Sequence, residues 1–427
     1  MRNRIACIGF IALLVVAAAQ AQQPLTLADA QTEARAHAPE TQELQAVIQG
    51  AQAVAAQANR RFRQDPTLSG GYFNGALIGQ DETTASVDVS LPVDVSGSRK
   101  PRAASAEADV QRATFDRDNG LLALDEQVAT AFADVALLQR RNARETQIEN
   151  LYAVAADAVH QQLGVGQAAQ LDADSADLDL AAARISLAQI RGQLAQARGR
   201  LARLLGRSAG NAIVASDAPE NAALPARPDF DALIDRDPRV RAARAEIDAA
   251  TFERQTYERL VTPTPTFGVS AAYNRRDIPP GSFTGVPAAG SLAATWHEPE
   301  LMFNVSVPLP LFDKQLEPRA HATARLLTAD ARAQTVRADV RAELEGAWTS
   351  FEAAAGALQA VADTPAMIDR DVMFVEQAVR AGQFDALTRS IELRRLQDAG
   401  IRADTAVRDY RVARAAWLRR SMTVAQP

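Results

Sequence analysis

The chain repeats one plan twice, and this duplication restricts its fold more than any other feature of the sequence. Pro39 and Pro66 recur 199 residues later as Pro238 and Pro265. Farther along, three more matches, one of them between the Gly-Gln pairs at 166 and 382, lie 216 or 217 residues apart. Five separated matches indicate an internal repeat, so two copies of one supersecondary unit are expected.

Each copy reads as a helical segment, two strands and two long helices, in that order. Alternation of apolar and polar residues predicts strands over 67–78 and 83–95 in the first copy, and over 266–274 and 302–311 in the second. Matching residues of the two copies lie 199 positions apart before the strand connection and 216 apart after it. The second copy therefore has about 17 additional residues in this connection. They fall in a segment rich in Pro and Gly over 275–300, which predicts a loop there.

The helices carry apolar seams with a seven-residue period. One series runs over 180–201 and another over 326–375. Such seams predict coiled-coil packing of long helices. Pro365 falls on the second seam and is expected to interrupt its helix. Glycine-containing turns at 163–167 and 380–385 divide the helices, so two long helical hairpins are predicted.

The strands are long enough to cross a lipid bilayer, since about 9–11 residues suffice for a tilted strand. Only closed barrels satisfy strand backbones in lipid, and four strands cannot close around a pore. Several chains would therefore share one barrel. A soluble β-sandwich shows the same alternation, and the strands alone leave both folds open.

The first residues have the pattern of a secretory signal. Arg2 and Arg4 precede a short apolar run and an Ala-x-Ala site, which predicts cleavage after Ala21. A transmembrane anchor is the alternative, but the run is short for a bilayer. Cys7, the only cysteine, lies inside this segment. The exported chain therefore needs no disulfide. Its formal net charge of −6 argues against nucleic-acid binding.

No group of residues carries a catalytic or metal-binding pattern. The sequence has no P-loop, nucleophile elbow or dinucleotide fingerprint. Its four histidines are scattered, and no HxxxH or CxxC spacing occurs. We therefore expect no catalytic residue, no cofactor and no resident metal site.

Several segments together resemble the TolC-like outer-membrane efflux proteins. They are LTLADAQTEARAHAPE at 25–40, VSLPVDVSGSRKPR at 89–102, VSVPLPLFDKQLEPRA at 305–320, and the turns LGVGQAAQLDA at 163–173 and RAGQFDAL at 380–387. Their order, spacing and duplication carry the likeness over essentially the whole chain after the signal. Within the family, the segments at the strand ends look most like outer-membrane components of cobalt–zinc–cadmium and copper–silver (heavy-metal) RND efflux systems.

The resemblance implies a fold that is mainly α with a small transmembrane β part. Three copies would form a twelve-stranded β-barrel in the outer membrane of a Gram-negative bacterium and a long periplasmic α-helical barrel. It implies a passive channel, not an enzyme, conducting divalent metal cations to the exterior. Its partners would be a periplasmic adaptor (membrane fusion protein), an inner-membrane RND-type pump and outer-membrane lipid. A channel for drug efflux or type I secretion, and a periplasmic adaptor, are the alternatives.

The chain divides, on this reading, into nine parts. These are a signal peptide (1–21), a helical segment of the first repeat (22–64), a barrel hairpin (65–98), a long helical hairpin (99–206), a linker (207–228), a helical segment of the second repeat (229–262), a second barrel hairpin (263–313), a second long helical hairpin (314–420) and a C-terminal tail (421–427).

The resemblance also assigns roles to three sets of residues. The helical turns would form the tip that docks the adaptor, although their glycines also suit a plain turn: Gly164, Val165, Gly166, Gln167, Ala381, Gly382 and Gln383. Candidate acids of a periplasmic gate, with solvated surface acids as the alternative, are Asp172, Asp174 and Asp385. Strand residues expected to face the lumen are Ser86, Asp88, Ser90, Asn304 and Ser306.

Arg99, Lys100 and Arg102 follow the first strand pair, where basic residues can anchor in lipid headgroups. A solvated charge at the start of a helix is the equal alternative.

Overall fold

The structure is a computed structural model of the chain. It describes residues 24–60, 62, 64–77, 80–208, 213–216, 224–278, 294–309, 315–380 and 386–421. The second helical turn therefore lies outside the described residues, and with it the predictions for Ala381, Gly382, Gln383 and Asp385.

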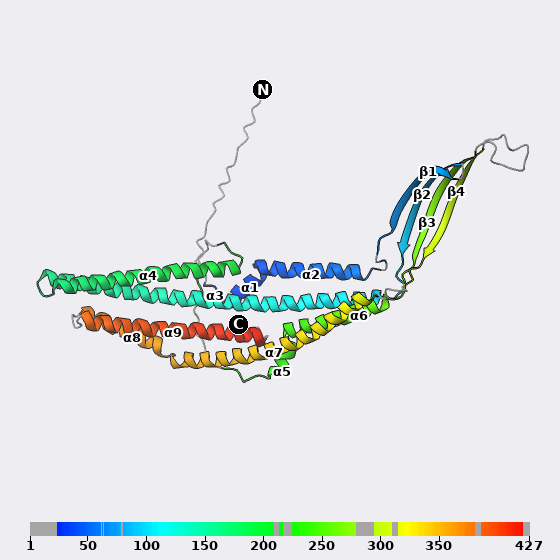
Figure 1. Cartoon of the computed structure of the whole chain (residues 1–427). Coiled ribbons are helices and arrows are strands. Elements are labelled where there is room, and N and C mark those ends of the chain that lie inside the picture. The colour runs from blue at the N-terminus through cyan, green and yellow to red at the C-terminus, as the bar shows by residue number, and fades with distance from the viewer. Residues whose placement is uncertain are drawn as a thin grey trace, which may run out of the picture. The chain divides into compact units, whose positions relative to one another are not determined.

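Helices dominate the described residues, which also form one small sheet (Figure 1). The elements are α1 (Leu27–His37), α2 (Pro39–Ala58), β1 (Thr67–Leu77), β2 (Gln80–Pro92), α3 (Arg99–Gly164), α4 (Gln170–Leu204), α5 (Phe230–Arg236), α6 (Pro238–Arg259), β3 (Thr266–Ile278), β4 (Ala294–Ser306), α7 (Leu316–Ala360), α8 (Thr364–Arg380) and α9 (Ala386–Ser421). The predicted fold class, mainly helical with a small strand part in two copies of one plan, is confirmed.

Several details of the strand prediction are wrong. The second strand starts at Gln80, three residues before the predicted position. The strand predicted over 302–311 instead runs over Ala294–Ser306. The strand predicted over 83–95 ends at Pro92, because Val93 instead donates its backbone N–H to the carbonyl of Pro265, at 2.8 Å. The segment 275–300 is not all loop, since β3 continues to Ile278 and β4 starts at Ala294. Pro299 lies inside β4, which a proline tolerates because β4 is an edge strand of the described sheet.

The chain divides into two compact units. The first comprises Met1–Thr41, Leu121–Pro228 and Glu345–Pro427, and the second comprises Gln42–Gly120 and Asp229–Leu344.

In the first unit, small alanines let α1 approach the α3–α4 hairpin closely. Ala30, Ala34 and Ala38 are fully buried against a cluster that includes Leu124 and Leu201. The predicted seven-residue seam and its companion series three residues behind are confirmed on α4, where most members are buried: Ala183, Leu187, Leu194, Ala197, Leu201 and Leu204. Ile190 of the companion series is half-buried.

The second hairpin of this unit has an aromatic core. Trp348 and Phe351 of α7 pack against Trp417 and Tyr410 of α9, with ring centroids 5.0 Å apart for the two tryptophans. The predicted interruption near Pro365 is confirmed, since α7 ends at Ala360 and α8 starts at Thr364. Proline cannot continue the backbone hydrogen-bond series of a helix, which explains the break.

Gly206 ends α4 in a conformation that other residues rarely adopt. Its φ is +69°, and a Cβ placed there would lie 2.6 Å from the carbonyl oxygen of His37. This glycine therefore permits the close passage of α1 beside the end of α4.

In the second unit, α2, α5, α6 and the adjoining parts of α3 and α7 form the helical portion. Ala245, Ala249 and Ala250 of α6 are buried, and Ser105 of α3 donates to the carbonyl of Ala249 at 2.9 Å.

Arg102 has a structural role that neither sequence-based alternative included. Its guanidinium donates to the carbonyl of Ala58 at 2.9 Å and to that of Arg60 at 3.2 Å. It therefore satisfies carbonyls left free where α2 ends.

The four strands form one antiparallel sheet with the order β1-β2-β3-β4, and Figure 1 shows them side by side. The register pairs Ser90 with Thr67 on one side and with Gly268 on the other, and Gly268 in turn with Asn304. Gly268 is required because a Cβ there would lie 1.9 Å from Oδ1 of Asn304. The Asn304 side chain thus covers the backbone of β3 and fixes the position of β4 against it.

Replacing Gly206 with alanine is expected to lower the free energy of unfolding by more than about 1 kcal/mol, because of its positive φ and the clash with His37. The matched control is Gly50→Ala in α2, where a Cβ meets nothing within 4 Å, and which should gain stability by up to about 1 kcal/mol. Thermal unfolding of both variants in detergent measures the difference. Equal melting temperatures would contradict the role of Gly206.

Candidate functional site

The sheet has one mainly polar and one mainly apolar face, because cross-strand partners in an antiparallel sheet project to the same side. The mainly polar face also carries Phe73, Trp296 and Met302. The register brings the predicted polar residues of both repeats to one face: Ser86, Asp88, Ser90, Asn304 and Ser306. Thr67 and Ser90 hydrogen-bond on this face, with their hydroxyl oxygens 2.6 Å apart. The residues that sequence reasoning grouped together are therefore neighbours in the structure.

The opposite face is apolar and exposed. Its large side chains come from all four strands: Leu68, Tyr72, Val87, Val89, Phe267, Val269, Tyr273, Leu301, Phe303 and Val305. Leu68 and Phe303 are 74% and 75% exposed. A continuous apolar surface of this kind on a sheet has to meet another apolar phase.

The apolar face becomes polar and then charged toward the β1–β2 and β3–β4 connections. Tyr273 lies beside His297, with its hydroxyl 2.6 Å from Nδ1 and the two rings stacked. Beyond them on the same face come Arg275 and Asp277, whose charged groups are 3.2 Å apart. An apolar band that ends in tyrosines and then in charges is typical of a surface at a membrane–water boundary.

The polar face is acidic. Among its described side chains Glu82, Asp88, Glu298 and Glu300 are negative, and Arg276 is positive. Arg276 pairs with Glu82 at 3.3 Å. Glu300 lies in a cross-strand row with Ala272, Ser86 and Gly71, so small residues leave the space around its carboxylate open.

The first helical turn is tight and exposed. Gly166 has a φ of +74°, and its N–H donates to the carbonyl of Leu163 at 3.0 Å. Gln167 donates to the carbonyl of Gln162 at 2.8 Å. Val165 is 71% exposed, and a Cβ added at the neighbouring Gly164 would meet nothing within 4 Å. A rigid turn with an exposed apolar residue is suited to docking, which stays a prediction for these residues.

The two candidate gate acids of the first turn make local hydrogen bonds. Oδ2 of Asp172 accepts from the backbone N–H of Ala169 at 3.1 Å and so caps the start of α4. Oδ1 of Asp174 accepts from the side chain of Gln170 at 2.9 Å. Both acids therefore have a structural role, and the gate remains a prediction.

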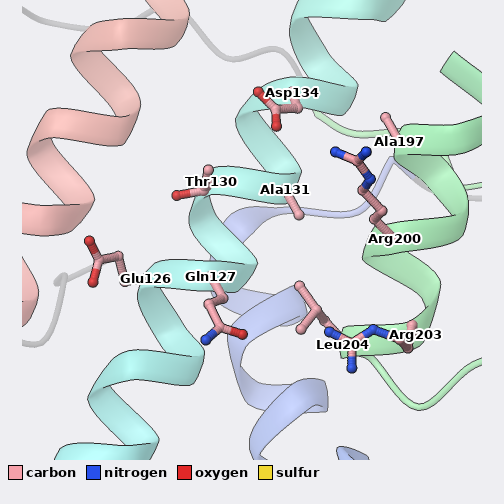
Figure 2. A pocket seen from close by; sticks show the side chains of 9 residues that line it. All are labelled: Glu126, Gln127, Thr130, Ala131, Asp134, Ala197, Arg200, Arg203 and Leu204. Atoms are coloured by element: carbon pink, nitrogen blue, oxygen red, sulfur yellow. The ribbon is translucent and has the colours of Figure 1, made fainter. Parts of the chain in front are cut away.

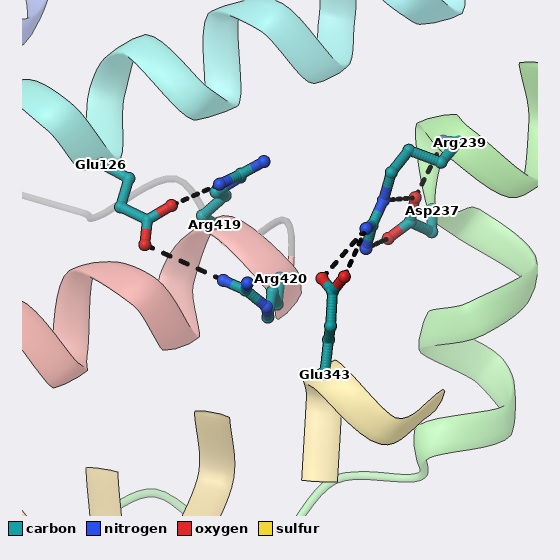
Figure 3. A network of polar contacts seen from close by, with 6 residues as sticks. All are labelled: Glu126, Asp237, Arg239, Glu343, Arg419 and Arg420. Atoms are coloured by element: carbon teal, nitrogen blue, oxygen red, sulfur yellow. Dashed lines mark hydrogen bonds and ion pairs between the residues drawn. The ribbon is translucent and has the colours of Figure 1, made fainter. Parts of the chain in front are cut away.

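Charged pairs join α3 to α9 within the first unit. Glu126 lies 2.5 Å from Arg419 and 3.8 Å from Arg420 (Figure 3). Farther along, Asp134 accepts from Arg408 at 2.9 Å. These pairs follow the length of the interface, so each helix has a defined register against the other.

Asp404 is the most enclosed member of this interface, at 3% exposed. It accepts from Arg144 and lies 3.9 Å from Arg140. Close by, Glu145 is also buried and accepts from Gln397 at 2.7 Å and Ser186 at 3.2 Å. The sequence analysis did not identify Asp404 or Glu145. One signal was available for Asp404, because the equivalent residue of the first repeat, 216 positions earlier, is Ala188.

A groove of about 490 Å³ runs between α3 and α4 (Figure 2). Arg200 and Arg203 line it from α4, and Glu126 and Asp134 from α3. Arg203 also bonds Glu40 at 2.8 Å. The pKa of Glu40 is lowered, first by its backbone hydrogen bond and then by Arg203. Three charged residues of this groove, Arg203, Glu126 and Asp134, pair with side chains of neighbouring helices.

In the second unit, charged pairs hold α5 and α6 to α7. Arg239 bonds Asp237 at 3.2 Å and Glu343 at 2.9 Å (Figure 3). Burial acts to lower the pKa of Arg239, but its bonds to these two carboxylates raise it overall. Hydrogen bonds from Arg337 and Arg244 hold the pKa of Asp235 below its usual value.

Two features are absent from the described residues. No group of three or more His, Cys, Asp or Glu side chains is placed to hold a metal ion there. Separately, no helix in the described ranges combines the length and apolar character needed to cross a bilayer.

The fold is shared with solved outer-membrane channels. The outer-membrane channel OprN matches with a TM-score of 0.69 at 20% identity, over 94% of this chain and 91% of that one. VceC, an outer membrane protein of Vibrio cholerae, matches with 0.68 at 15% identity, over 92% and 95%. CusC, studied for transmembrane channel formation, matches with 0.65 at 17% identity, over 92% and 91%. The chain therefore has the fold of an outer-membrane channel.

One family model matches part of the sequence. Residues 31–207 match the model of the family described as Outer membrane efflux protein. No curated protein matches the sequence significantly.

Replacing Asp404 with asparagine is expected to lower the free energy of unfolding by roughly 1–3 kcal/mol, because Arg140 and Arg144 lose their buried anion. Asp398→Asn, an exposed acid of the same helix, should change it by less than about 0.5 kcal/mol. Chemical denaturation of both variants provides the measurement. A similar small effect for both would show that Asp404 does not stabilise the α3–α9 interface.

Proposed function

We propose that the chain is one subunit of an outer-membrane channel that serves as the exit duct of a tripartite efflux system. The observation that carries the proposal is the two-faced sheet, with an apolar face exposed over four strands and a polar face opposite. In a barrel wall, lipid-facing and lumen-facing residues alternate in this way. The channel fold and the family match of residues 31–207 support it.

Three copies of the chain would complete the barrel. Within the described sheet β1 and β4 have no neighbour on their outer sides, and such edges cannot stay unpaired in lipid. Pairing β4 of one copy with β1 of the next gives twelve strands from three copies. Ser86, Asp88 and Ser90 would then line the lumen, and Val87 and Val89 would face lipid.

The other components would act at the helical end. A periplasmic adaptor would dock on the turn at Gly164, Val165, Gly166 and Gln167, and an inner-membrane RND-type pump would supply energy. Export through a cleaved signal peptide would bring the chain to the outer membrane. The exposed Val165 and the rigid backbone around Gly166 support this docking role.

Divalent metal cations are the proposed cargo. The acidic polar face favours cations over anions, as rings of carboxylates do in cation channels. The heavy-metal subgroup that the sequence resembles supports the same choice. A channel for drug efflux or type I secretion shares the fold, and a pump of either type encoded beside this chain would favour it.

Arginine substitutions on the two faces test the membrane location. Val87→Arg is expected to cost about 2–4 kcal/mol if the side chain lies at the bilayer midplane, and so to reduce the amount assembled in outer membranes. Ser86→Arg, one residue away on the other face, should assemble normally and change the conductance in planar bilayers. Equal assembly of both variants would reject a membrane location for the sheet.

Charge selectivity tests the cargo. In a salt gradient across a planar bilayer, the reversal potential of the native channel should show preference for cations. Glu298→Gln combined with Glu300→Gln is expected to move it toward zero, whereas Asp277→Asn on the apolar face should leave it unchanged. A native channel that prefers anions would rule out metal cations as cargo.

A further inference from the structure

The groove between α3 and α4 is a part of the first unit to which the proposed channel assigns no role. Its volume of about 490 Å³ is in the range of pockets that hold small molecules. Its lining residues come from α3 between Glu126 and Asp134 and from α4 between Ala197 and Leu204, all within that unit. The groove is therefore complete in a single copy of the chain.

The two acids that line the groove are both paired with arginines of α9. Glu126 lies 2.5 Å from Arg419 and 3.8 Å from Arg420. Asp134 accepts from Arg408 at 2.9 Å. A cation that entered the groove would have to compete with these guanidinium groups for both carboxylates. The acids therefore do not make the groove a site for cations.

Arg200 differs from the other charged residues of the groove, because it makes no ion pair or hydrogen bond with any described residue. Arg203, the other lining arginine, bonds Glu40 at 2.8 Å. In Figure 2, Arg200 extends from α4 toward α3. A guanidinium presents a fork of N–H donors that matches the two oxygens of a carboxylate. Among the described lining residues, Arg200 thus supplies one positive charge that one negative charge can balance.

Two neutral side chains of α3 add hydrogen-bond donors to the lining. The amide of Gln127 and the hydroxyl of Thr130 have no hydrogen-bond partner among the described residues. Figure 2 shows Thr130 farther from α4 than Ala131, so the groove continues over α3 beyond Arg200. A molecule held at Arg200 can therefore place a hydroxyl or carbonyl oxygen near these donors.

The remaining lining of the groove is apolar. It consists of Ala131 of α3 and of Ala197 and Leu204 of α4. Ala197 and Leu204 are buried members of the hydrophobic core, so this part of the groove has a fixed position. A ring system that covers it removes apolar surface from water, which favours binding. The groove thus combines one unpaired cation, two neutral donors and an apolar surface.

We propose that the groove between α3 and α4 binds a small amphipathic organic anion, namely a ring-containing monocarboxylate with a hydroxyl or carbonyl group at its far end. Arg200 holds the carboxylate through two N–H donors, the ring covers Ala131, and Gln127 or Thr130 donates to the distal oxygen. A phosphate dianion fits less well, because its second charge has no unpaired cation here. The site goes beyond the proposed function, since it needs neither a second copy nor a membrane.

Calorimetric titration of the detergent-solubilised full chain tests the site, with a hydroxynaphthoate that carries its two groups on opposite rings as the probe. Arg200→Gln should weaken binding by about tenfold or more, because the carboxylate loses its charged partner. The matched control is Arg191→Gln. Arg191 is an exposed residue of the same helix, and it lies about two and a half turns away, on the opposite side of α4. It should leave the affinity unchanged.

Two related probes test the chemical class of the ligand. Naphthylmethanol, which has an alcohol in place of the carboxylate, should bind the native chain and Arg200→Gln equally weakly. Naphthoate without the hydroxyl should bind the native chain about two- to tenfold more weakly than the hydroxynaphthoate, the effect of one hydrogen bond. That difference should disappear when Gln127→Ala and Thr130→Val are combined. Comparing variants in one detergent removes the contribution of probe dissolved in micelles.

Three results would overturn the proposal: no binding to the native chain, equal binding to the native chain and to Arg200→Gln, and displacement of the probe by an equal concentration of inorganic phosphate. Thermal unfolding supplies a second readout, since the hydroxynaphthoate should raise the melting temperature of the native chain and not that of Arg200→Gln. The outcome is independent of the channel function. Probe binding without conductance in planar bilayers would support this site and reject the channel, and conductance without probe binding would do the reverse.

Discussion

The period-two alternation of side chains in the four strands is the constraint on which the rest of the structure depends. A shift of one residue in any strand would move its apolar set to the polar face. The register is held at the end of the sheet where β2 stops, by the hydrogen bond of Val93 to Pro265 and by Asn304 lying over Gly268. Both contacts join segments far apart in the sequence, so the two repeats have to come together before either face is complete.

Different interactions determine the packing inside each helical hairpin and the packing between the two hairpins. Inside a hairpin, apolar seams with a seven-residue period determine the packing, and both repeats use the same positions. Between α3 and α9, buried and half-buried ion pairs such as Arg144–Asp404 determine it. A buried acid among arginines adds little net stability, since desolvation offsets much of the attraction, but it disfavours every other register. The packing inside each hairpin therefore uses positions common to both repeats, whereas the contact between hairpins uses charged residues that differ between the repeats.

The sequence alone was sufficient for the features that depend on local periodicity. The strands, the long helices, the seams and the interruption at Pro365 all follow from spacing along the chain. The strand ends were harder to predict. The segment 275–300 is rich in Pro and Gly, yet its first and last residues belong to β3 and β4 and pair with each other. The roles of Asp404 and Arg102 were out of reach, since each depends on an element more than forty residues away. The polar face of the sheet was predictable because side chains alternate between the two faces along each strand. Antiparallel pairing then places the residues of one face side by side.

Pro299 in β4 has a consequence for what can pair with that strand. Within the described sheet β4 is an open edge, and such edges attract extended segments nearby. Proline has no backbone N–H, so an incoming strand finds one bond fewer on the edge that carries it. In the oligomer that we propose, a second copy would make more contacts than a stray segment and would tolerate the missing bond. Pro299 would thus disfavour the pairing of unrelated segments with β4, and it would favour correct assembly over aggregation.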